Sequence, residues 1–163
     1  MYDCIIIGLG PAGINASIYA KRSNLNILVF EKNMPGGTLH NIKEVDNYLG
    51  YEHITGSELA KQFYKQFKEQ KIKQVSDEVL EINDNINYKE VITKNGRYEA
   101  RTVIICTGRG AKKLNLKNED LPGVSTCVLC DGALYKDKTV ALYGNKPAVL
   151  EEAIYLSGLA KKL

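Results

Sequence analysis

The sequence has 163 residues, 44% hydrophobic and 25% charged, which is typical of a soluble globular protein with one domain, or one domain and part of another. Its net charge of +3 comes from interspersed lysines and acids, which argues against a nucleic-acid-binding surface or a membrane-binding face. It lacks the run of about 18 apolar residues of a membrane helix, and residues 1–8 lack a signal peptide's basic region, so we expect a cytoplasmic protein.

The N-terminal residues have the pattern of a dinucleotide-binding βαβ unit. Residues 4–7 are continuously apolar, as in a strand buried on both faces, and they lead into Gly8-Leu9-Gly10-Pro11-Ala12-Gly13. Residues 14–22 predict a helix, and residues 26–31 predict a second strand that ends on Glu31, 18 residues after Gly13. A lone G-x-G-x-x-G is weak evidence, but this one has the strand, helix, second strand and acid that the unit requires.

Each part of this motif has a specific task. Gly8 permits a tight turn, Gly10 lets a pyrophosphate approach the backbone, and Gly13 allows close packing of helix against strand. The helix N-terminus offers free N–H groups and its positive dipole end to the phosphates. Glu31 is predicted to accept hydrogen bonds from ribose hydroxyls, and an acid there argues against a 2′-phosphate in this site.

The middle of the chain predicts an antiparallel meander. Polar, glycine-containing loops at residues 34–39 and 44–50 precede an amphipathic helix over residues 57–70. Strands are predicted over residues 73–82, 87–93 and 98–106, with Asn95-Gly96 as a type I′ hairpin turn. The apolar run 102–106 predicts a buried strand that rejoins the parallel sheet and brings Thr107-Gly108 to the ligand crevice.

The C-terminal part combines two cysteines with a second βα pattern. Cys127 and Cys130 lie in Cys127-Val128-Leu129-Cys130-Asp131-Gly132, so they can close a small disulfide, and Asp131 beside them can move a proton. A zinc site is the alternative, but no second C-x-x-C and no H-x-x-x-H supplies the other ligands. Residues 139–143 predict a buried strand, followed by the loop 144–149 and a helix that extends to residue 162.

The order of these motifs resembles the low-molecular-weight thioredoxin reductases, flavoproteins with two dinucleotide-binding domains. The resemblance covers essentially the whole chain and rests on the motifs at residues 8–13, 35–39, 44–48, 106–108 and 127–132. It implies an α/β fold with a Rossmann-like FAD/NAD(P)-binding three-layer ββα domain and a β-meander insertion over residues 1–112. Residues 113–163 would hold the redox-active segment and the first βα unit of a second nucleotide-binding domain.

The resemblance also implies a cofactor and residue roles. FAD is the implied cofactor, Cys130 the thiol nearest the flavin, Cys127 the thiol that attacks the substrate disulfide, and Asp131 the proton donor to the leaving thiolate. Residues 36–39 and Asn47 would lie along the flavin, and Val79 near the adenine. The implied cofactor-binding residues are Gly8, Gly10, Pro11, Ala12, Gly13, Glu31, Lys32, Gly36, Gly37, Thr38, Leu39, Asn47, Val79, Thr107 and Gly108.

Two departures from the family pattern bear on function. The second nucleotide motif runs Gly144-Asn145-Lys146-Pro147-Ala148-Val149 instead of G-x-G-x-x-A, and Lys146 and Val149 argue against NADPH bound in the usual way. Members with degenerate motifs of this kind can take electrons from ferredoxin, so ferredoxin is a rival donor. The family is also roughly twice as long, so the chain resembles its N-terminal half, without the rest of the nicotinamide domain.

These observations predict an enzyme. We expect an FAD-dependent thiol-disulfide oxidoreductase that passes electrons through Cys127 and Cys130 to thioredoxin or a similar small dithiol protein. The resemblance implies a homodimer where the family's full length is present. The alternative is a truncated or degenerate relative that binds flavin without catalysis.

Overall fold

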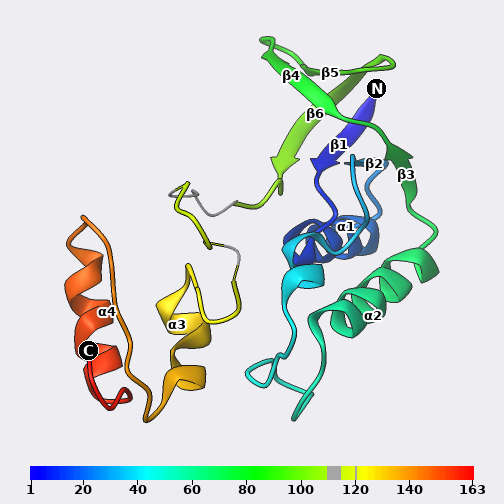
Figure 1. The fold of residues 1–163 in the computed structure, drawn as a ribbon. Helices are drawn as coiled ribbons and strands as arrows, with labels where there is room; N and C mark the ends of the chain where they lie inside the picture. The colour runs from blue at the N-terminus through cyan, green and yellow to red at the C-terminus, as the bar shows by residue number, and fades with distance from the viewer. Residues whose placement is uncertain (110–114, 120) are drawn as a thin grey trace. The chain divides into compact units, whose positions relative to one another are not determined.

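A computed structural model describes residues 1–109, 115–119 and 121–163, and the chain divides into two units, Met1–Arg109 and Gly110–Leu163. The first unit holds a sheet with helices, and the second holds short helical segments (Figure 1). The expected domain boundary between residues 112 and 113 lies outside the described residues. No helix in the described part of the chain is long and apolar enough to cross a membrane.

One mixed six-stranded sheet forms the frame of the first unit. Its strands are β1 (Tyr2–Ile7), β2 (Ile27–Glu31), β3 (Lys73–Ser76), β4 (Val79–Asp84), β5 (Lys89–Thr93) and β6 (Arg97–Ile105). The order is β3-β2-β1-β6-β5-β4, in which β3, β2, β1 and β6 are parallel, β5 is antiparallel to β6, and β4 is antiparallel to β5. This arrangement confirms the predicted α/β fold with an antiparallel meander.

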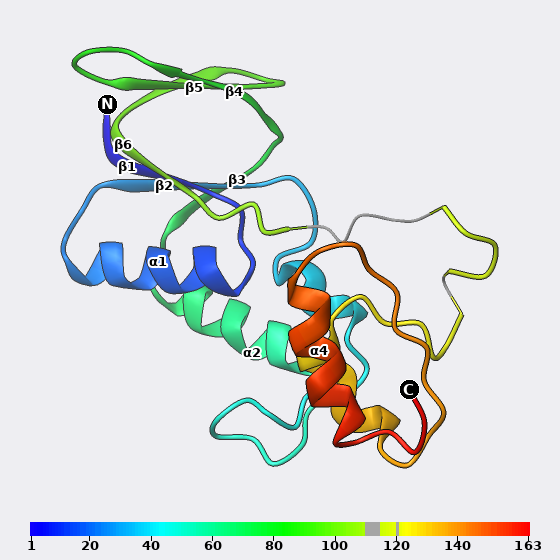
Figure 2. The same cartoon turned by 90° about the vertical axis from the view of Figure 1, so that its left-hand side faces the viewer.

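Alternating side chains of the parallel strands pack into two separate hydrophobic cores. Helices α1 (Pro11–Arg22) and α2 (Gly56–Glu69) lie on one side of these strands, and the β4–β5 hairpin lies on the other (Figure 2). Ile6 of β1 packs in the core on the helix side, whereas its neighbour Ile5 packs in the core with residues of the meander. Successive strand residues point to opposite faces, so one apolar strand serves both layers.

Helix α2 begins at a capping box, which explains why it starts where it does. The Thr55 hydroxyl accepts a hydrogen bond from the Glu58 N–H at 3.2 Å, and the Glu58 carboxylate accepts one from the Thr55 N–H at 3.2 Å. Two N–H groups that the helix leaves unpaired are satisfied in this way. The apolar stripe of the helix then buries Leu59 and Phe67.

The strand expected over residues 73–82 was wrong, because the structure divides it into β3 and β4 at opposite ends of the sheet. Hydrogen bonds of Asp77 stabilise the connection between β3 and β4. Its carboxylate accepts hydrogen bonds from the Glu78 N–H at 2.8 Å and from the Asn95 N–H at 3.3 Å. Its own N–H donates to the carbonyl of Glu31 at 3.2 Å. These contacts redirect the chain from the β2 side of the sheet to the hairpin on the other side.

The end of β6 is less buried than its apolar sequence predicts. Ile104 is 40% exposed and Ile105 is 65% exposed. The reason lies in the pairing, because β5 pairs with β6 only from Arg97 to Ala100. Beyond Ala100, β6 keeps β1 as its only neighbour among the described strands. The strand does rejoin the parallel sheet, as predicted, but as an open edge.

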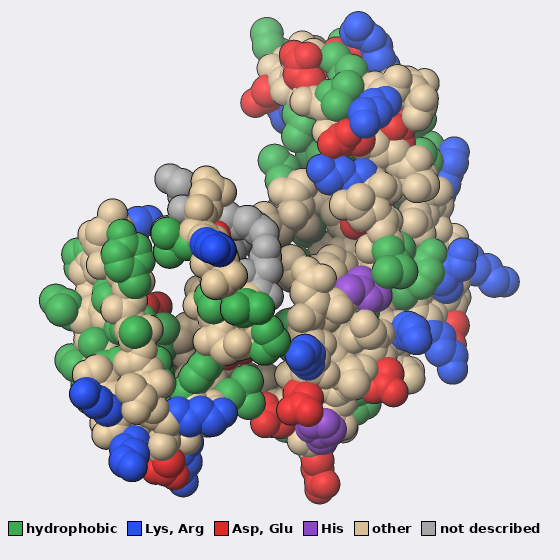
Figure 3. Space-filling view, viewed as in Figure 1, with side chains coloured by type: hydrophobic (Ala, Val, Ile, Leu, Met, Phe, Trp, Pro, Cys, Tyr) green, Lys and Arg blue, Asp and Glu red, His purple; other side chains and the backbone are tan. Residues whose placement is uncertain are grey.

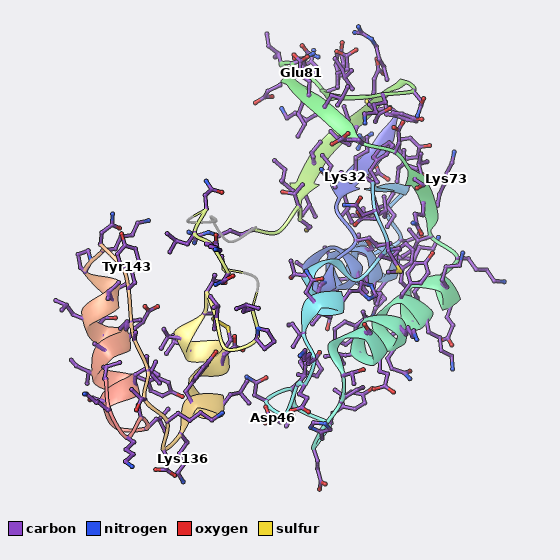
Figure 4. The ribbon with its side chains drawn as sticks, viewed as in Figure 1. Lys32, Asp46, Lys73, Glu81, Lys136 and Tyr143 are labelled. Carbon is purple, nitrogen blue, oxygen red and sulfur yellow. A yellow bond between two sulfur atoms is a disulfide. The ribbon has the colours of Figure 1, made fainter. Side chains whose placement is uncertain are left out.

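The second unit consists of α3 (Val128–Asp131), the 3₁₀ segment η2 (Gly132–Tyr135) and α4 (Ala148–Ser157). The strand expected over residues 139–143 was wrong, since only an isolated bridge between Thr139 and Lys162 forms there. A parallel strand needs a continuous neighbour, and the described residues supply none beyond this bridge. Tyr143 is accordingly 78% exposed (Figure 4). Apolar side chains of this unit reach its surface, as Figure 3 shows. Leu150 and Ile154 of α4 are exposed.

Candidate functional site

The glycine-rich loop after β1 makes a tight turn with close backbone contacts. Gly8 has a φ of 98°, and a Cβ added there would collide with the carbonyl of Cys106. A Cβ added at Gly13 would collide with the carbonyl oxygen of Gly8, so α1 approaches the end of β1 as closely as its backbone allows. These two positions therefore need glycine for the fold itself.

Gly10 differs from these two glycines because the space beside it is open. No atom lies within 4 Å of a Cβ added at Gly10, which is the extended N-cap residue of α1. Pro11 opens the helix, where its missing N–H costs nothing, and Pro11 and Ala12 are exposed. The N-terminus of a twelve-residue helix thus faces a gap that a phosphate group can enter.

Glu31 lies at the end of β2 with its carboxylate against the glycine loop. Its Oε2 accepts a hydrogen bond from the Leu9 N–H at 2.7 Å, and its Oε1 accepts one from the Asn33 N–H at 2.9 Å. An ionised carboxylate can accept about four hydrogen bonds, so both oxygens keep capacity for ribose hydroxyls. Glu31 therefore fixes the glycine loop and can still accept hydrogen bonds from a ribose.

Lys32, labelled in Figure 4, follows Glu31. It takes part in an ion-pair cluster. Its ammonium lies 3.1 Å from one Glu78 oxygen, and the Lys94 ammonium lies 2.6 Å from the other. Hydrogen bonds from Lys94 and then Lys32 lower the pKa of Glu78. The cluster lines a shallow cavity with Asn33 and Asp77, and Val79 at the start of β4 comes directly after it.

A second glycine pair brings residues 36–39 to the first loop. Gly36 has a φ of 116°, and its N–H donates to the Leu9 carbonyl at 2.8 Å. A Cβ added at Gly37 would lie 3.4 Å from the Gly10 Cα. Thr38 and Leu39 continue into the 3₁₀ segment η1 (Gly37–Asn41). The structure thus joins two motifs that are far apart in sequence.

His40 holds this second loop, although the sequence analysis did not single it out. Its Nε2–H donates to the Pro35 carbonyl at 2.8 Å, and its Nδ1 lies 3.5 Å from the Ser57 hydroxyl of α2. No sequence signal marks this role, because the partner serine is 17 residues away. Asn47 lies apart from these contacts, in an exposed loop closed by a bridge between Val45 and Ile54.

Thr107 and Gly108 follow β6 at the same sheet edge as the glycine loop. The Cys106 N–H donates to the Ile7 carbonyl at 2.7 Å, and a Cβ added at Gly8 would lie 3.1 Å from the Thr107 nitrogen. Burial is the main cause that raises the pKa of the Cys106 thiol, with Cys4 as a smaller cause. This thiol is therefore held in its uncharged form, as expected of a packing residue.

The first unit fits a dinucleotide. The open space at Gly10, the carboxylate of Glu31 and the backbone of Gly36 to Leu39 converge at the carboxyl ends of β1 and β2. That edge of a parallel sheet is where such ligands bind in folds of this type. The roles of the individual residues, including Asn47 and Val79, stay predictions.

In the second unit, Cys127 and Cys130 form a disulfide with Cα atoms 5.3 Å apart. Cys127 is the N-cap of α3, and its sulfur accepts a hydrogen bond from the Cys130 N–H at 3.3 Å. Cys127 is half-buried and Cys130 is exposed. No group of three or more metal-ligating side chains lies together among the described residues.

Ser125 forms hydrogen bonds with residues of the cysteine motif, and the sequence analysis did not identify it. Its hydroxyl donates to Asp131 Oδ2 at 2.6 Å and accepts from the Cys127 N–H at 3.1 Å. A serine two residues before a helix N-cap is a weak sequence signal, because such serines often hydrogen-bond the local backbone. Its link to Asp131 depends on the folded turn.

The second nucleotide motif differs from the first at the corresponding positions. Val149 stands where the first motif has Gly13, and its Cγ2 occupies the space that a Cβ on Gly144 would need. Lys146, in the position of Gly10, is exposed, and its carbonyl accepts from the Val149 N–H at 3.0 Å. Backbone does not pack against backbone here as it does at Gly8 and Gly13. The described residues of this loop therefore do not reproduce the cradle of the first unit.

Comparisons with known proteins show which proteins the sequence is similar to. The sequence is 40% identical to the thioredoxin reductase of Ureaplasma parvum, with 100% of this chain and 54% of that relative covered. It is 38% identical to the thioredoxin reductase of Bacillus subtilis, with 100% and 52% covered. The chain thus spans about half the length of the curated relatives it matches.

Solved structures show the same pattern. The thioredoxin reductase from Streptococcus pyogenes matches with a TM-score of 0.92 and 42% identity, over 99% of this chain and 54% of that one. A ferredoxin-flavin thioredoxin reductase from Clostridium acetobutylicum matches with a TM-score of 0.64 and 34% identity, over 99% and 57%. These matches confirm the resemblance drawn from the motifs.

A family match covers almost all of the sequence. Residues 2–163 match the family described as pyridine nucleotide-disulphide oxidoreductase. The glycine loop of the first unit and the cysteine pair of the second are both included in that span. The chain belongs to the pyridine nucleotide-disulphide oxidoreductase family.

Proposed function

We propose that this chain is the FAD-binding and dithiol-bearing part of a thiol-disulfide oxidoreductase that reduces thioredoxin or a similar small dithiol protein. The observation that carries the proposal is the joint presence of an open glycine loop for a dinucleotide and a Cys127–Cys130 disulfide beside Asp131. The thioredoxin reductases that resemble the chain support the same assignment.

In the FAD site, Gly8, Gly10 and Gly13 receive the pyrophosphate and Glu31 receives the adenosine ribose. Residues 36–39, Asn47, Thr107 and Gly108 line the rest of the cofactor, Val79 lies toward the adenine, and Lys32 is a further cofactor-binding residue. When bound, FAD supplies the two-electron chemistry that reduces a disulfide. The protein's own part is to hold the cofactor and to present the cysteine pair.

The dithiol step conserves atoms and electrons. The Cys127 thiolate attacks one sulfur of the substrate disulfide, so that the substrate S–S bond breaks and a mixed disulfide forms. The Cys130 thiolate then attacks Cys127, which restores the Cys127–Cys130 bond and releases the second substrate thiol. Two electrons pass to the substrate, and each leaving thiolate takes a proton, which in this proposal comes through Asp131.

Reconstitution with FAD tests this assignment. We expect the purified chain to retain flavin through gel filtration, and the dithiothreitol-reduced chain, freed of dithiothreitol, to reduce oxidised thioredoxin. Cys130→Ser should lose that reduction, while Cys4→Ala, which changes a buried free cysteine, should keep it. A folded chain that retains no flavin, or a Cys130→Ser variant with full activity, would contradict the proposal.

A second candidate concerns the electron donor. The Val149 side chain fills the space beside Gly144, which favours an electron donor other than NADPH. Ferredoxin is the alternative, and the similarity to a ferredoxin-flavin thioredoxin reductase from Clostridium acetobutylicum supports it. Thermal unfolding with added NADPH separates the two, since a ligand that binds the folded state raises its melting temperature. A clear rise would favour NADPH. A homodimer and a cytoplasmic location stay predictions.

A further inference from the structure

The hydroxyl of Ser125 lies between the backbone of Cys127 and the side chain of Asp131. It accepts a hydrogen bond from the Cys127 N–H at 3.1 Å and lies 2.6 Å from Asp131 Oδ2. The Cys127 carbonyl is also within reach, but at 3.3 Å. A serine hydroxyl has a single proton to donate, and the shorter contact, with Asp131 Oδ2, takes it.

The helix that carries Asp131 is too short to fix this side chain alone. α3 has four residues, which is about one turn, and an isolated turn is marginally stable in water. The Asp131 N–H donates to the Cys127 carbonyl at 3.1 Å, which anchors the backbone but leaves the carboxylate free to rotate. Ser125 supplies the missing restraint on the carboxylate and ties it to the residue whose sulfur attacks the substrate.

We infer that Ser125 is a positioning residue that holds the Asp131 carboxylate for proton transfer to the leaving thiolate, an inference that rests on the proposed function. Because the hydroxyl occupies Oδ2, the transferred proton is carried on Oδ1. As the substrate S–S bond breaks and the Cys127–substrate S–S bond forms, that proton moves from Oδ1 to the departing sulfur. The carboxylate then regains a proton from water.

Two disulfides with different leaving groups test this role. An alkyl disulfide such as hydroxyethyl disulfide releases a thiolate that needs a proton, whereas an aromatic nitrobenzoate disulfide releases one that is stable without it. The chain is reduced with dithiothreitol, desalted and mixed with each disulfide in a stopped-flow instrument. A variant with Cys127→Ser and Cys130→Ser measures the background from Cys4 and Cys106.

We expect Ser125→Ala to slow the reaction with the alkyl disulfide about tenfold, as for loss of one hydrogen bond, and to leave the reaction with the aromatic one unchanged. Ser125→Thr keeps the hydroxyl and should restore the rate. Ser157→Ala is the matched control, because the Ser157 hydroxyl donates to the Ile154 carbonyl within α4, outside the turn that holds Cys127 and Asp131. In an Asp131→Asn background, Ser125→Ala should cause no further slowing.

Three results would overturn the inference: equal slowing with both disulfides, no rescue by Ser125→Thr, or full additivity with Asp131→Asn. Equal slowing would mean that Ser125 supports the turn rather than proton transfer. Failure of the proposed function looks different, because the reduced wild-type pair would then react with neither disulfide. That outcome would overturn the function and the inference together.

Discussion

Two alanine substitutions in the glycine loop separate its structural task from its proposed ligand-binding task. At Gly10 the backbone has a φ of −75°, and an added Cβ meets no atom within 4 Å, so alanine fits without strain. The loss of glycine's freedom in the unfolded chain should even stabilise the protein by about 0.4–1 kcal/mol. At Gly13 the added Cβ meets the Gly8 carbonyl, and forced overpacking of this kind costs about 1–3 kcal/mol or more.

For the stabilisation by FAD, we expect the ranking of the two variants to reverse, with Gly10→Ala as the more harmful substitution. At an FAD concentration of about 100 times its dissociation constant, binding stabilises the folded state by about 2.7 kcal/mol. For a unit of roughly 100 residues this corresponds to a rise in melting temperature of roughly 10–20 °C. If the pyrophosphate approaches beside Gly10 as proposed, Gly10→Ala should lose most of this rise, because its Cβ would fill that space although the variant's own stability is intact.

Differential scanning calorimetry with and without FAD measures both quantities. We expect Gly10→Ala to melt at or slightly above the wild-type temperature without FAD, and Gly13→Ala to melt several degrees lower. A Gly10→Ala variant with the full FAD-induced rise would refute the assignment of Gly10 to the pyrophosphate. A Gly13→Ala variant as stable as the wild type would refute the close contact with Gly8.

Three further predictions concern stability. Glu31→Gln should cost about 1–3 kcal/mol in urea unfolding, since an amide cannot accept from the N–H of both Leu9, which is buried, and Asn33 with unchanged geometry. Thr55→Ala should cost about 1 kcal/mol, because the capping box of α2 is lost. The pKa of Glu78 is lowered from its ordinary value of 4.5, so its contribution is present above pH 4.5 and lost as the pH falls through the lower folded pKa. Glu78→Gln should therefore lose less stability on acidification below pH 4.5 than the wild type.

Each of these has an outcome that would count against it. Equal urea midpoints for Glu31→Gln and the wild type would mean that the Leu9 contact contributes nothing. A Thr55→Ala variant with unchanged stability would show that water replaces the cap. Identical acid profiles for Glu78→Gln and the wild type would assign the acid response to other carboxylates. Asp77, whose pKa is lowered chiefly by a hydrogen bond with the Thr93 side chain, would be the first to examine.

The sequence by itself determined the first βαβ unit and the two motifs that carry the proposed chemistry. An apolar strand, a spaced glycine motif and a helix are local patterns, so their order is readable without long-range contacts. The need for glycine at positions 8 and 13 could be predicted because only a residue without a Cβ permits that turn and that packing. The spacing of Cys127 and Cys130 is equally local.

Tertiary contacts decided the rest. Residues 73–82 have β-forming side chains at both ends, and only the strand-disfavouring Asp77 and Glu78 interrupt them. The hydrogen bonds of Asp77 with the distant Glu31 and Asn95 show that the chain leaves one edge of the sheet for the other there. Residues 139–143 are apolar enough for a strand, but a strand also requires a paired neighbour. His40 and Ser125 acquire their partners only when loops fold back. Local residue types thus fixed which elements can form, while pairing fixed where each lies and which polar side chains meet.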